Sequence, residues 1–279
     1  MRELDMTQFH ILSPGKDDIV QPKILKISVS DVMHAVGQGF SDFTKKPSHY
    51  IFAILIAPVI CYAMYLVALD RQTVQHLFPL LGGFALLGPM LGLFLYEMSR
   101  TIELNLNPSW GQVLKVKSNP AIPAIIALSI MLFGLFLLWL LTADTLYEFL
   151  YPSEYPASVI EFLNEIIGTK RGWTLIICGN IIGFCFALFA LSTTVIAFPL
   201  LLDRDVGLIC AIETSLKAMK ANTLPLLTWG VIVVIGLLLG LAFFVVGLIV
   251  IFPIFGHATW HIYRKVIDSR GTRPTFTLP

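Results

Sequence analysis

A long uncharged run near the C-terminus constrains the fold more than any other feature of the chain. It extends from Leu224 to Gly256 and contains no Asp, Glu, Lys or Arg. As one α-helix it would be about 50 Å long, against about 30 Å for the hydrocarbon core of a bilayer. We therefore expect two membrane helices joined by a tight turn near Phe243–Gly247. The second helix continues to about Lys265, with a kink at Pro253 that neighbouring helices satisfy.

Four earlier apolar runs have the length of single membrane spans. The composition agrees, because 56% of the residues are hydrophobic and 13% are charged, whereas soluble domains are about 25% charged. The sequence predicts an all-α, polytopic membrane protein with short interfacial helices and six transmembrane helices at about 50–69, 77–96, 121–142, 173–202, 224–243 and 246–265. The rest of the chain divides into a cytoplasmic N-terminal segment, 1–49, and a cytoplasmic tail, 267–279, on either side of the membrane domain, 50–266.

Positive charges are distributed unevenly between the predicted spans. Most Lys and Arg residues fall on the side of the two termini, and only Arg71, Lys170 and Arg171 fall on the other. Because Lys and Arg accumulate in cytoplasmic loops, we expect both termini in the cytoplasm and the segment 143–172 outside. This orientation is typical of a multi-pass protein of the bacterial inner membrane.

Amphipathic segments outside the spans predict short helices at the membrane surface. Ser30 can cap a helix that ends before Pro47, and Asn107 can cap another that begins at Pro108. Two further apolar stripes have helical spacing: Val159, Phe162, Leu163 and Ile166, and Ile209, Ile212, Leu216 and Met219. We interpret all four segments as interfacial connectors rather than as binding surfaces.

Two parts of the chain are alike. GPMLGLFLYEMSR leads through an amphipathic segment to LKVKSNPAIP, and FPLLLDRD leads through another to LKAMKANTLP. Each has a proline late in a span, an acid and an arginine at its end, and a Lys-x-Asn before the next span. A parallel repeat of this kind occurs in some transporters, and the shared chemistry of membrane boundaries explains the likeness equally well.

Glycine pairs four residues apart let membrane helices approach closely. The chain has three, Gly88–Gly92, Gly179–Gly183 and Gly236–Gly240. They predict a compact helix bundle. Contact with a second copy or with another membrane protein is the alternative use of these faces.

Motifs of soluble enzymes are missing from the sequence, which has no phosphate loop, GxSxG, HExxH or dinucleotide fingerprint. Ionisable residues avoid the span centres, which counts against proton pumps and ion-coupled carriers. Asn180 is the main polar side chain within a span, and we expect it to hydrogen-bond to another helix. We expect no catalytic residue, no cofactor and no nucleic-acid partner, and the expected environment is the lipid bilayer.

Polar residues gather at the predicted cytoplasmic ends of the spans: Glu97, Arg100, Asn119, Asp203, Arg204, Asn222, His257 and His261. Ion pairing and helix capping account for such a ring, and a binding vestibule for a small polar molecule, a headgroup or a partner loop is the alternative. His257 and His261 lie one helical turn apart and are weak candidates for metal ligands, which would need a further ligand from the acids of the ring. We assign Trp260 and Tyr263 to the aromatic belt at the membrane surface.

The chain resembles a bacterial family of predicted integral membrane proteins known as domain of unknown function 2189. The likeness rests on VMHAVGQGFSDFTKKP, PLLGGFALLGPMLGLFLYEMSR, FPLLLDRDVGLICAIETSLKAMKAN, and WG followed by PIFGHATWHIYRKV. The resemblance implies a polytopic inner-membrane protein, and it implies no reaction.

The sequence leaves open which class of function the protein has. A non-enzymatic scaffold or assembly component fits the glycine faces and the absence of buried ionisable groups in the spans. A transporter or lipid-handling protein fits the repeat and the polar ring. A metal- or haem-binding respiratory accessory protein depends on His257 and His261.

Overall fold

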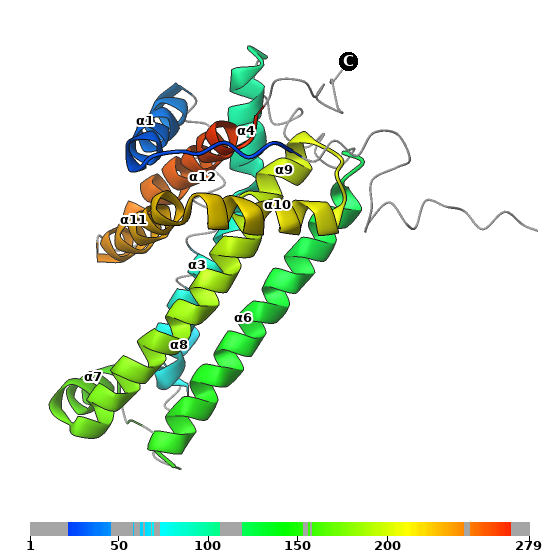
Figure 1. Cartoon of the computed structure of the whole chain (residues 1–279). Coiled ribbons are helices and arrows are strands. Elements are labelled where there is room, and N and C mark those ends of the chain that lie inside the picture. Colours follow the sequence, from blue (N-terminus) through cyan, green and yellow to red (C-terminus); the bar gives the residue numbers. More distant parts are fainter. Residues whose placement is uncertain are drawn as a thin grey trace, which may run out of the picture. The chain divides into compact units, whose positions relative to one another are not determined.

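The computed structural model describes residues 22–45, 73–106, 119–152, 158–242 and 246–268, with single positions between 58 and 69 and at 156. In these ranges the regular secondary structure is helical, apart from one isolated β-bridge between Ile24 and Ile267. The helices (Figure 1) are α1 (Val29–Lys45), the 3-10 turn η3 (Val74–His76), α3 (Leu77–Leu91), α4 (Leu93–Glu103), α6 (Ile122–Leu150), α7 (Val159–Gly168), α8 (Lys170–Thr194), α9 (Ala197–Asp203), α10 (Leu208–Ala221), α11 (Thr223–Ala242) and α12 (Val246–Val266).

Four helical runs of the described residues are long and apolar enough to cross a membrane: Val74–Glu103, Ile122–Leu150, Lys170–Asp203 and Thr223–Ala242. The long uncharged run is divided into α11 and α12, and α12 is not among the four. The expected first span, 50–69, and the helix expected from Pro108 lie largely or wholly outside the described residues. The described part of the chain is therefore α-helical and contains four membrane-length helices.

Two of the long runs are interrupted close to their ends. The first breaks at Gly92, between α3 and α4, and the second breaks at Val195–Ile196, between α8 and α9. Pro89 lies in α3 and Pro199 in α9. A proline at 199 has no N–H to donate to the carbonyl of Val195, so the regular helix cannot pass through that turn. Each run consequently ends in a short, separate helix: α4 carries Glu97 and Arg100, and α9 ends at Asp203 with Arg204 as its C-cap.

The chain divides into two compact units. The terminal unit comprises 1–53, 89–131 and 191–279, and the middle unit comprises 54–88 and 132–190. Each unit is therefore assembled from segments that are distant in the chain.

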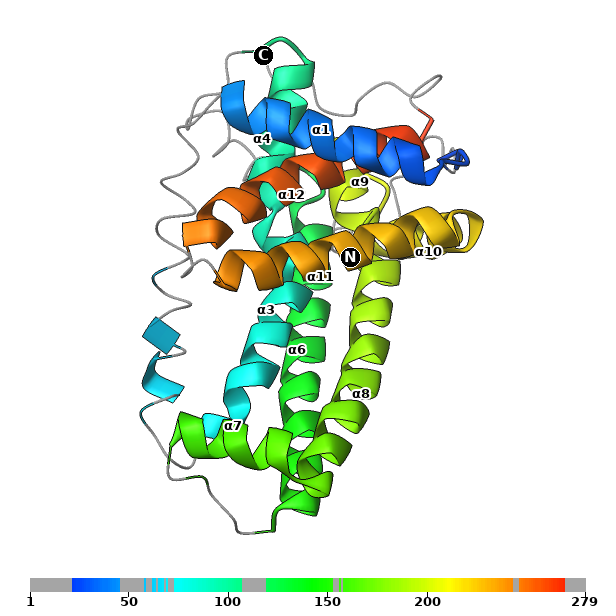
Figure 2. The ribbon, with the colours of Figure 1, turned by 90° about the vertical axis from the view of Figure 1, so that its left-hand side faces the viewer.

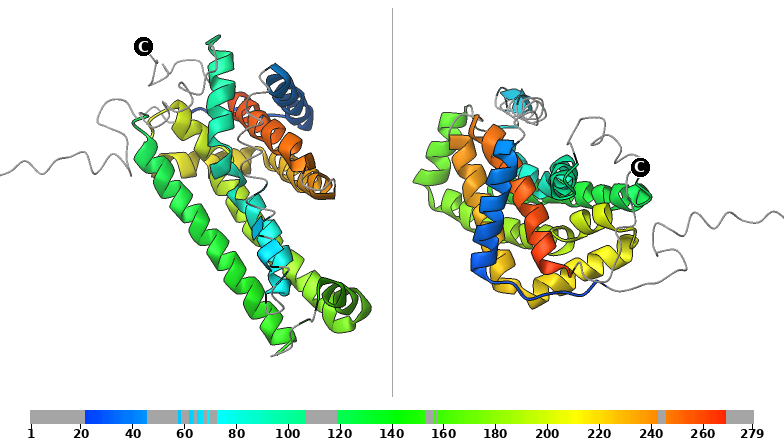
Figure 3. Two further views of the ribbon diagram at one scale, coloured as in Figure 1. Left: turned by 180° about the vertical axis from the view of Figure 1, so that it is seen from behind. Right: turned by 90° about the horizontal axis from the view of Figure 1, so that it is seen from above.

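The terminal unit is built around α12. Helices α1 and α11 both contact α12, and Figure 2 shows the three stacked in the order α1, α12, α11, with α4 crossing behind α1 and α12. Helix α1 runs antiparallel to α12, because Asp31 meets Lys265 whereas Asp42 meets His261. The N-terminal segment runs past the end of α12 (Figure 3), where the β-bridge joins the two ends of the described chain.

Helix α1 buries one stripe that includes an acid. Val32, Ala35, Gly39, Asp42 and Phe43 are buried, at the three- and four-residue spacing of a helix face. Gly39 permits a close approach to α12, because a Cβ there would lie 2.6 Å from the carbonyl oxygen of Ile254.

The cap of α1 differs from the prediction, which placed it at Ser30. The Ser28 hydroxyl donates to the Asp31 carboxylate at 2.7 Å, and the Asp31 backbone N–H donates back to the Ser28 oxygen at 3.2 Å. Ser30 instead lies inside the helix. The helix is capped at Ser28 because the reciprocal bonding needs an acid three residues after the cap, and Asp31 is that acid.

The α11–α12 hairpin uses its glycine pair internally. A Cβ on Gly236 would overlap the ring of Phe255, and one on Gly240 would meet Leu248. A Cβ on Gly88, by contrast, would have no neighbour within 4 Å. Of the first pair, Gly88 is therefore open in the described part of the chain, whereas Gly92 is buried and a Cβ on it would lie 2.7 Å from the Tyr96 hydroxyl; the last pair is used for packing.

The middle unit contains a cluster of buried side chains: Val74, Tyr147, Tyr151 and Phe162. Nearby, Trp139 donates to the carbonyl of Pro79 at 2.7 Å, and a Cβ on Gly183 would contact the same indole at 3.1 Å. Three residues of the predicted stripe of α7, Val159, Phe162 and Ile166, pack in this cluster. The fourth, Leu163, remains 49% exposed.

Asn180 does not connect helices as predicted. Its amide donates to the carbonyl of Ile176, one turn earlier in α8, at 2.8 Å. Asn180 lies on an exposed side of α8, and a short polar side chain in a helix readily hydrogen-bonds to the carbonyl one turn earlier.

Candidate functional site: the polar centre of the terminal unit

An ion-pair core joins the ends of α4 and α9. Arg100 donates to both carboxylate oxygens of Glu97, at 3.1 and 3.2 Å, and its Nε lies 3.8 Å from Asp203. The Nε of Arg204 lies 3.5 Å from the same Asp203. All four side chains are buried, with at most 8% of any residue exposed. Buried charges of this kind are tolerable because each acid faces a guanidinium.

The core extends to α12 through a second set of pairs. Tyr263 donates to Asp203 at 2.6 Å, and Arg264 lies 3.5 Å from the same carboxylate. Arg264 also binds Glu103 at 2.7 Å, and the Trp260 indole donates to the other oxygen of Glu103 at 3.0 Å. The network thus contains the acids Glu97, Glu103 and Asp203 and the bases Arg100, Arg204 and Arg264, so its formal charges cancel.

A separate hydrogen-bonded chain connects α1, α4 and α12. Ser99 lies 2.9 Å from a carboxylate oxygen of Asp42 and 2.7 Å from Nδ1 of His257. Nε2 of His261 lies 2.8 Å from that same oxygen of Asp42. An ionised carboxylate only accepts hydrogen bonds. Ser99 must therefore give its one proton to Asp42 and accept from Nδ1–H of His257, which fixes the tautomer of that imidazole when it is neutral.

Asp42 is held in its ionised form. Burial raises the pKa of its carboxyl, but the hydrogen bonds from His261 and Ser99 and the charges of His261 and His257 outweigh burial and hold the pKa below its ordinary value. Lys45 adds a cation 3.6 Å from the other carboxylate oxygen. Ser99 consequently serves as a donor to a carboxylate and is not activated as a nucleophile.

Two asparagines fasten segments that are distant in the chain. Asn119 donates to the carbonyl of Leu202 at 3.0 Å and accepts from the N–H of Ala121 at the start of α6. Asn222 donates to the carbonyl of Leu25 at 3.0 Å and accepts from the N–H of Ile27 at 2.8 Å. The Asn222 side chain therefore forms the two hydrogen bonds that a neighbouring β-strand would otherwise form with the N-terminal segment.

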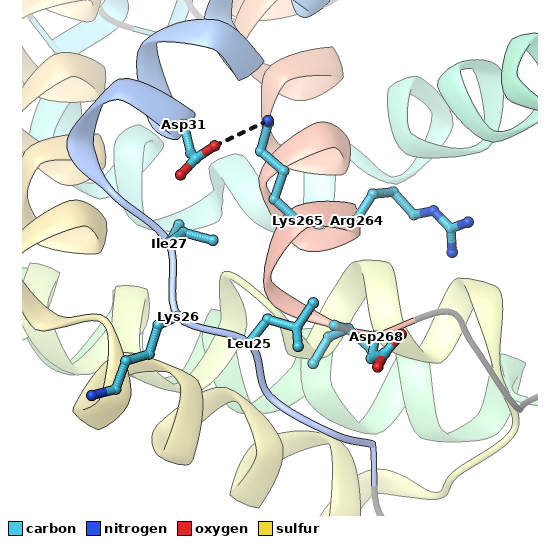
Figure 4. A pocket seen from close by; sticks show the side chains of 8 residues that line it. Leu25, Lys26, Ile27, Asp31, Arg264, Lys265 and Asp268 are labelled. Atoms are coloured by element: carbon cyan, nitrogen blue, oxygen red, sulfur yellow. Dashed lines mark hydrogen bonds and ion pairs between the residues drawn. The ribbon is translucent and has the colours of Figure 1, made fainter.

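The end of α12 completes the attachment of the N-terminal segment. The N–H of Leu25 donates to the carbonyl of Val266 at 2.7 Å, and that of Asp268 donates to Lys23 at 3.0 Å. Figure 4 shows Lys265 reaching from α12 to Asp31 at the start of α1, a distance of 3.3 Å. These contacts surround a shallow hollow of about 300 Å³.

A larger hollow of about 600 Å³ opens between α1, α4 and α12. Asp42, Ser99 and His261 line it, together with Lys45, Arg264 and Lys265. The remaining lining residues are Gln38, Ser41, Ile102, Glu103 and Asn105. Ile102 is the single aliphatic side chain of this set, so the hollow suits a polar ligand.

Comparison with known proteins identifies the family. Residues 77–203 match the family described as predicted integral membrane protein (DUF2189). Through this segment the chain belongs to that family. No curated protein and no solved structure matches the chain. The resemblance seen in the sequence is thus confirmed, and this DUF2189 protein is an integral membrane protein.

The predicted ring is divided in this DUF2189 protein. Glu97, Arg100, Asp203 and Arg204 form the ion-pair core, and Asn119 binds beside it through Leu202. His257 and His261 belong instead to the chain through Ser99 and Asp42, and Asn222 binds the N-terminal segment. Within the described residues, no group of three or more His, Cys, Asp or Glu side chains is placed to hold a metal ion.

The belt assignment of Trp260 and Tyr263 is wrong. They are 1% and 0% exposed, because each gives its polar hydrogen to a carboxylate inside the unit. The sequence reasoning also missed Asp42, Ser99, Glu103 and Arg264 as members of the polar centre. Asp42 had a readable signal, since it lies on the apolar stripe of an amphipathic helix, where an acid needs a partner.

Proposed function

We propose that this protein is a non-enzymatic scaffold or assembly component of the bacterial inner membrane, with both termini in the cytoplasm and six transmembrane helices. The observation that carries the proposal is the use of the polar centre. Its acids and arginines neutralise one another and join α4, α9 and α12. Side chains committed to fixing helices are suited to holding a rigid shape, and rigid helices are good platforms for docking.

The open position at Gly88 provides a place for a partner. Gly88 has no neighbour for a Cβ within 4 Å. Membrane helices associate through such faces, since close backbone contact replaces the hydrophobic force that is absent in lipid. A second copy or another membrane protein fits this face.

Extraction from native membranes followed by co-purification tests the scaffold. We expect a partner or a second copy at stoichiometric yield from the wild type, and its loss from Gly88→Leu. Gly134→Leu is the matched control, because a Cβ at Gly134 also meets nothing within 4 Å but Gly134 has no small residue four positions away. Recovery of the wild type only as a free monomer contradicts the proposal.

A second candidate function is lipid handling or transport through a vestibule on the cytoplasmic face. The hollow of about 600 Å³ favours it, because ligand sites commonly enclose about 300–1,000 Å³. Thermal-shift measurements on detergent-solubilised protein test this function with a panel of amphiphiles and metabolites. Stabilisation by none of them contradicts it.

A further inference from the structure

We infer that the hollow between α1, α4 and α12 binds a phosphate group, through Lys45, Arg264 and Lys265. This inference rests on the vestibule proposed above and names the chemistry of its ligand. All three cationic side chains line the same hollow. They come from both helices of an antiparallel pair, α1 and α12.

The acids that line the hollow are already occupied by donors of the protein. One oxygen of Asp42 accepts from Ser99 and His261, at 2.9 and 2.8 Å. One oxygen of Glu103 accepts from Arg264, and the other accepts from Trp260 at 3.0 Å. These carboxylates therefore have little capacity left for a cationic ligand, which makes a metal ion or an amine a poor fit.

The lysines, by contrast, retain donors. An ammonium group has three N–H donors, and Lys45 has one acid near it, Asp42 at 3.6 Å. Lys265 has Asp31 at 3.3 Å. Both side chains remain partly accessible, with 56% and 26% exposed. Each ammonium group therefore has donors to offer an anion in the hollow.

Phosphate fits this combination better than a carboxylate does. Its oxygens can accept from several ammonium and guanidinium donors at once. Ser41, Gln38 and Asn105 add neutral groups on the same lining. The charge pattern of the chain puts this face in the cytoplasm, where the leaflet carries anionic lipids, so the phosphate can belong to a lipid headgroup or to a soluble phosphate ester.

Binding to the full-length protein in zwitterionic detergent tests the inference. The probes are phosphatidylglycerol in mixed micelles, diacylglycerol as the lipid control without phosphate, and glycerol 3-phosphate in water. We expect saturable stabilisation by phosphatidylglycerol, by glycerol 3-phosphate, or by both. Response to the lipid alone assigns a headgroup site, and response to glycerol 3-phosphate assigns a site for soluble phosphate esters.

Substitutions identify the hollow as the place of binding. Lys45→Gln should weaken binding about tenfold, since a hydrogen bond to a charged group is worth roughly that factor, whereas Lys45→Arg should retain it. Lys217→Gln is the matched control, because Lys217 is an exposed lysine paired with Glu213 outside the hollow. The control should leave affinity unchanged.

Two results overturn the inference. One is the absence of saturable binding by either phosphate probe. The other is an equal loss of affinity in Lys45→Gln and Lys217→Gln, which would mean general attraction to positive charge. Stabilisation by a ligand without phosphate, in the absence of any response to the phosphate probes, also contradicts the inference but leaves the vestibule itself standing.

Discussion

Asp42 joins α1 to α4 and α12 through one carboxylate. It accepts from Ser99 and His261, and both donors lie on helices far from it in the chain. Removal of the charge weakens two buried hydrogen bonds at once. We expect Asp42→Asn to lower the free energy of unfolding by about 2 kcal/mol, measured by thermal denaturation in detergent. Glu213→Gln is the control, since that acid forms an exposed pair with Lys217.

The same carboxylate predicts a dependence on pH. Its pKa in the folded protein is lowered from its ordinary value, so its contribution is present above the pKa of an unfolded aspartate, about 3.9, and is lost as the pH falls through the lower folded pKa. The stability difference between the wild type and Asp42→Asn should therefore be constant from neutral pH down to about 4 and shrink below it. A difference that disappears near pH 6 would contradict this assignment and point to a histidine.

Asn222 is the residue that decides whether the N-terminal segment stays attached. Its amide binds both Leu25 and Ile27. In Asn222→Ala we expect faster hydrogen exchange at the Ile27 amide, by about tenfold, with the helices unchanged. Asn180→Ala is the matched control, because that amide bonds only within its own helix. Equal exchange in both variants would show that the β-bridge holds the segment unaided.

The pairing of α1 with α12 depends on backbone contact. A Cβ on Gly39 would lie 2.6 Å from one backbone atom of α12 and 2.7 Å from another, whereas a Cβ on Gly37 would meet nothing within 4 Å. We expect Gly39→Ala to cost about 1–3 kcal/mol through overpacking. Gly37→Ala should be neutral or stabilise by up to about 1 kcal/mol, since alanine favours the helix. Thermal denaturation of the two variants compares them directly, and equal melting temperatures contradict the close approach.

Helix α10 shows which part of an element can be predicted. Of the predicted interfacial stripe, Ile209 and Leu216 are 51% and 45% exposed, whereas Met219 is buried. The face that packs within the unit instead contains Ala211, Ser215 and Ala218. In a membrane protein, large apolar residues can face the lipid, because lipid and protein interior are both apolar. Hydropathy therefore does not identify the face that packs against other helices, which is marked instead by small residues that allow close approach.

At the scale of the whole molecule, the outer surface of α11 is apolar along its length. Leu224, Val231, Ile235 and Leu238 are each more than half exposed. Exposure of so many large apolar side chains to water costs free energy, and such surfaces are unusual in water-soluble proteins. A bilayer removes this cost. The observation agrees with the membrane family of the chain.

The six-span arrangement makes a prediction about the turn between α11 and α12. In a cysteine-free background, Ala242→Cys should react with an impermeant maleimide added outside intact cells, as should Lys170→Cys, and Lys23→Cys should react only after lysis. Labelling of Ala242→Cys only after lysis would mean that the hairpin enters and leaves the membrane from the cytoplasm. That result would contradict six spans and leave the four membrane-length helices unaffected.

The sequence by itself determined the membrane environment, the helical class and the division of the uncharged run, because hydropathy and helix length are local properties. It also placed charged residues at the ends of α4 and α9. Only the tertiary structure decided which partners they have. Asp42 meets His261, and Asn222 meets Leu25, because helices remote in the chain pack together. Such pairings depend on the geometry of packed elements, which no single stretch of residues contains.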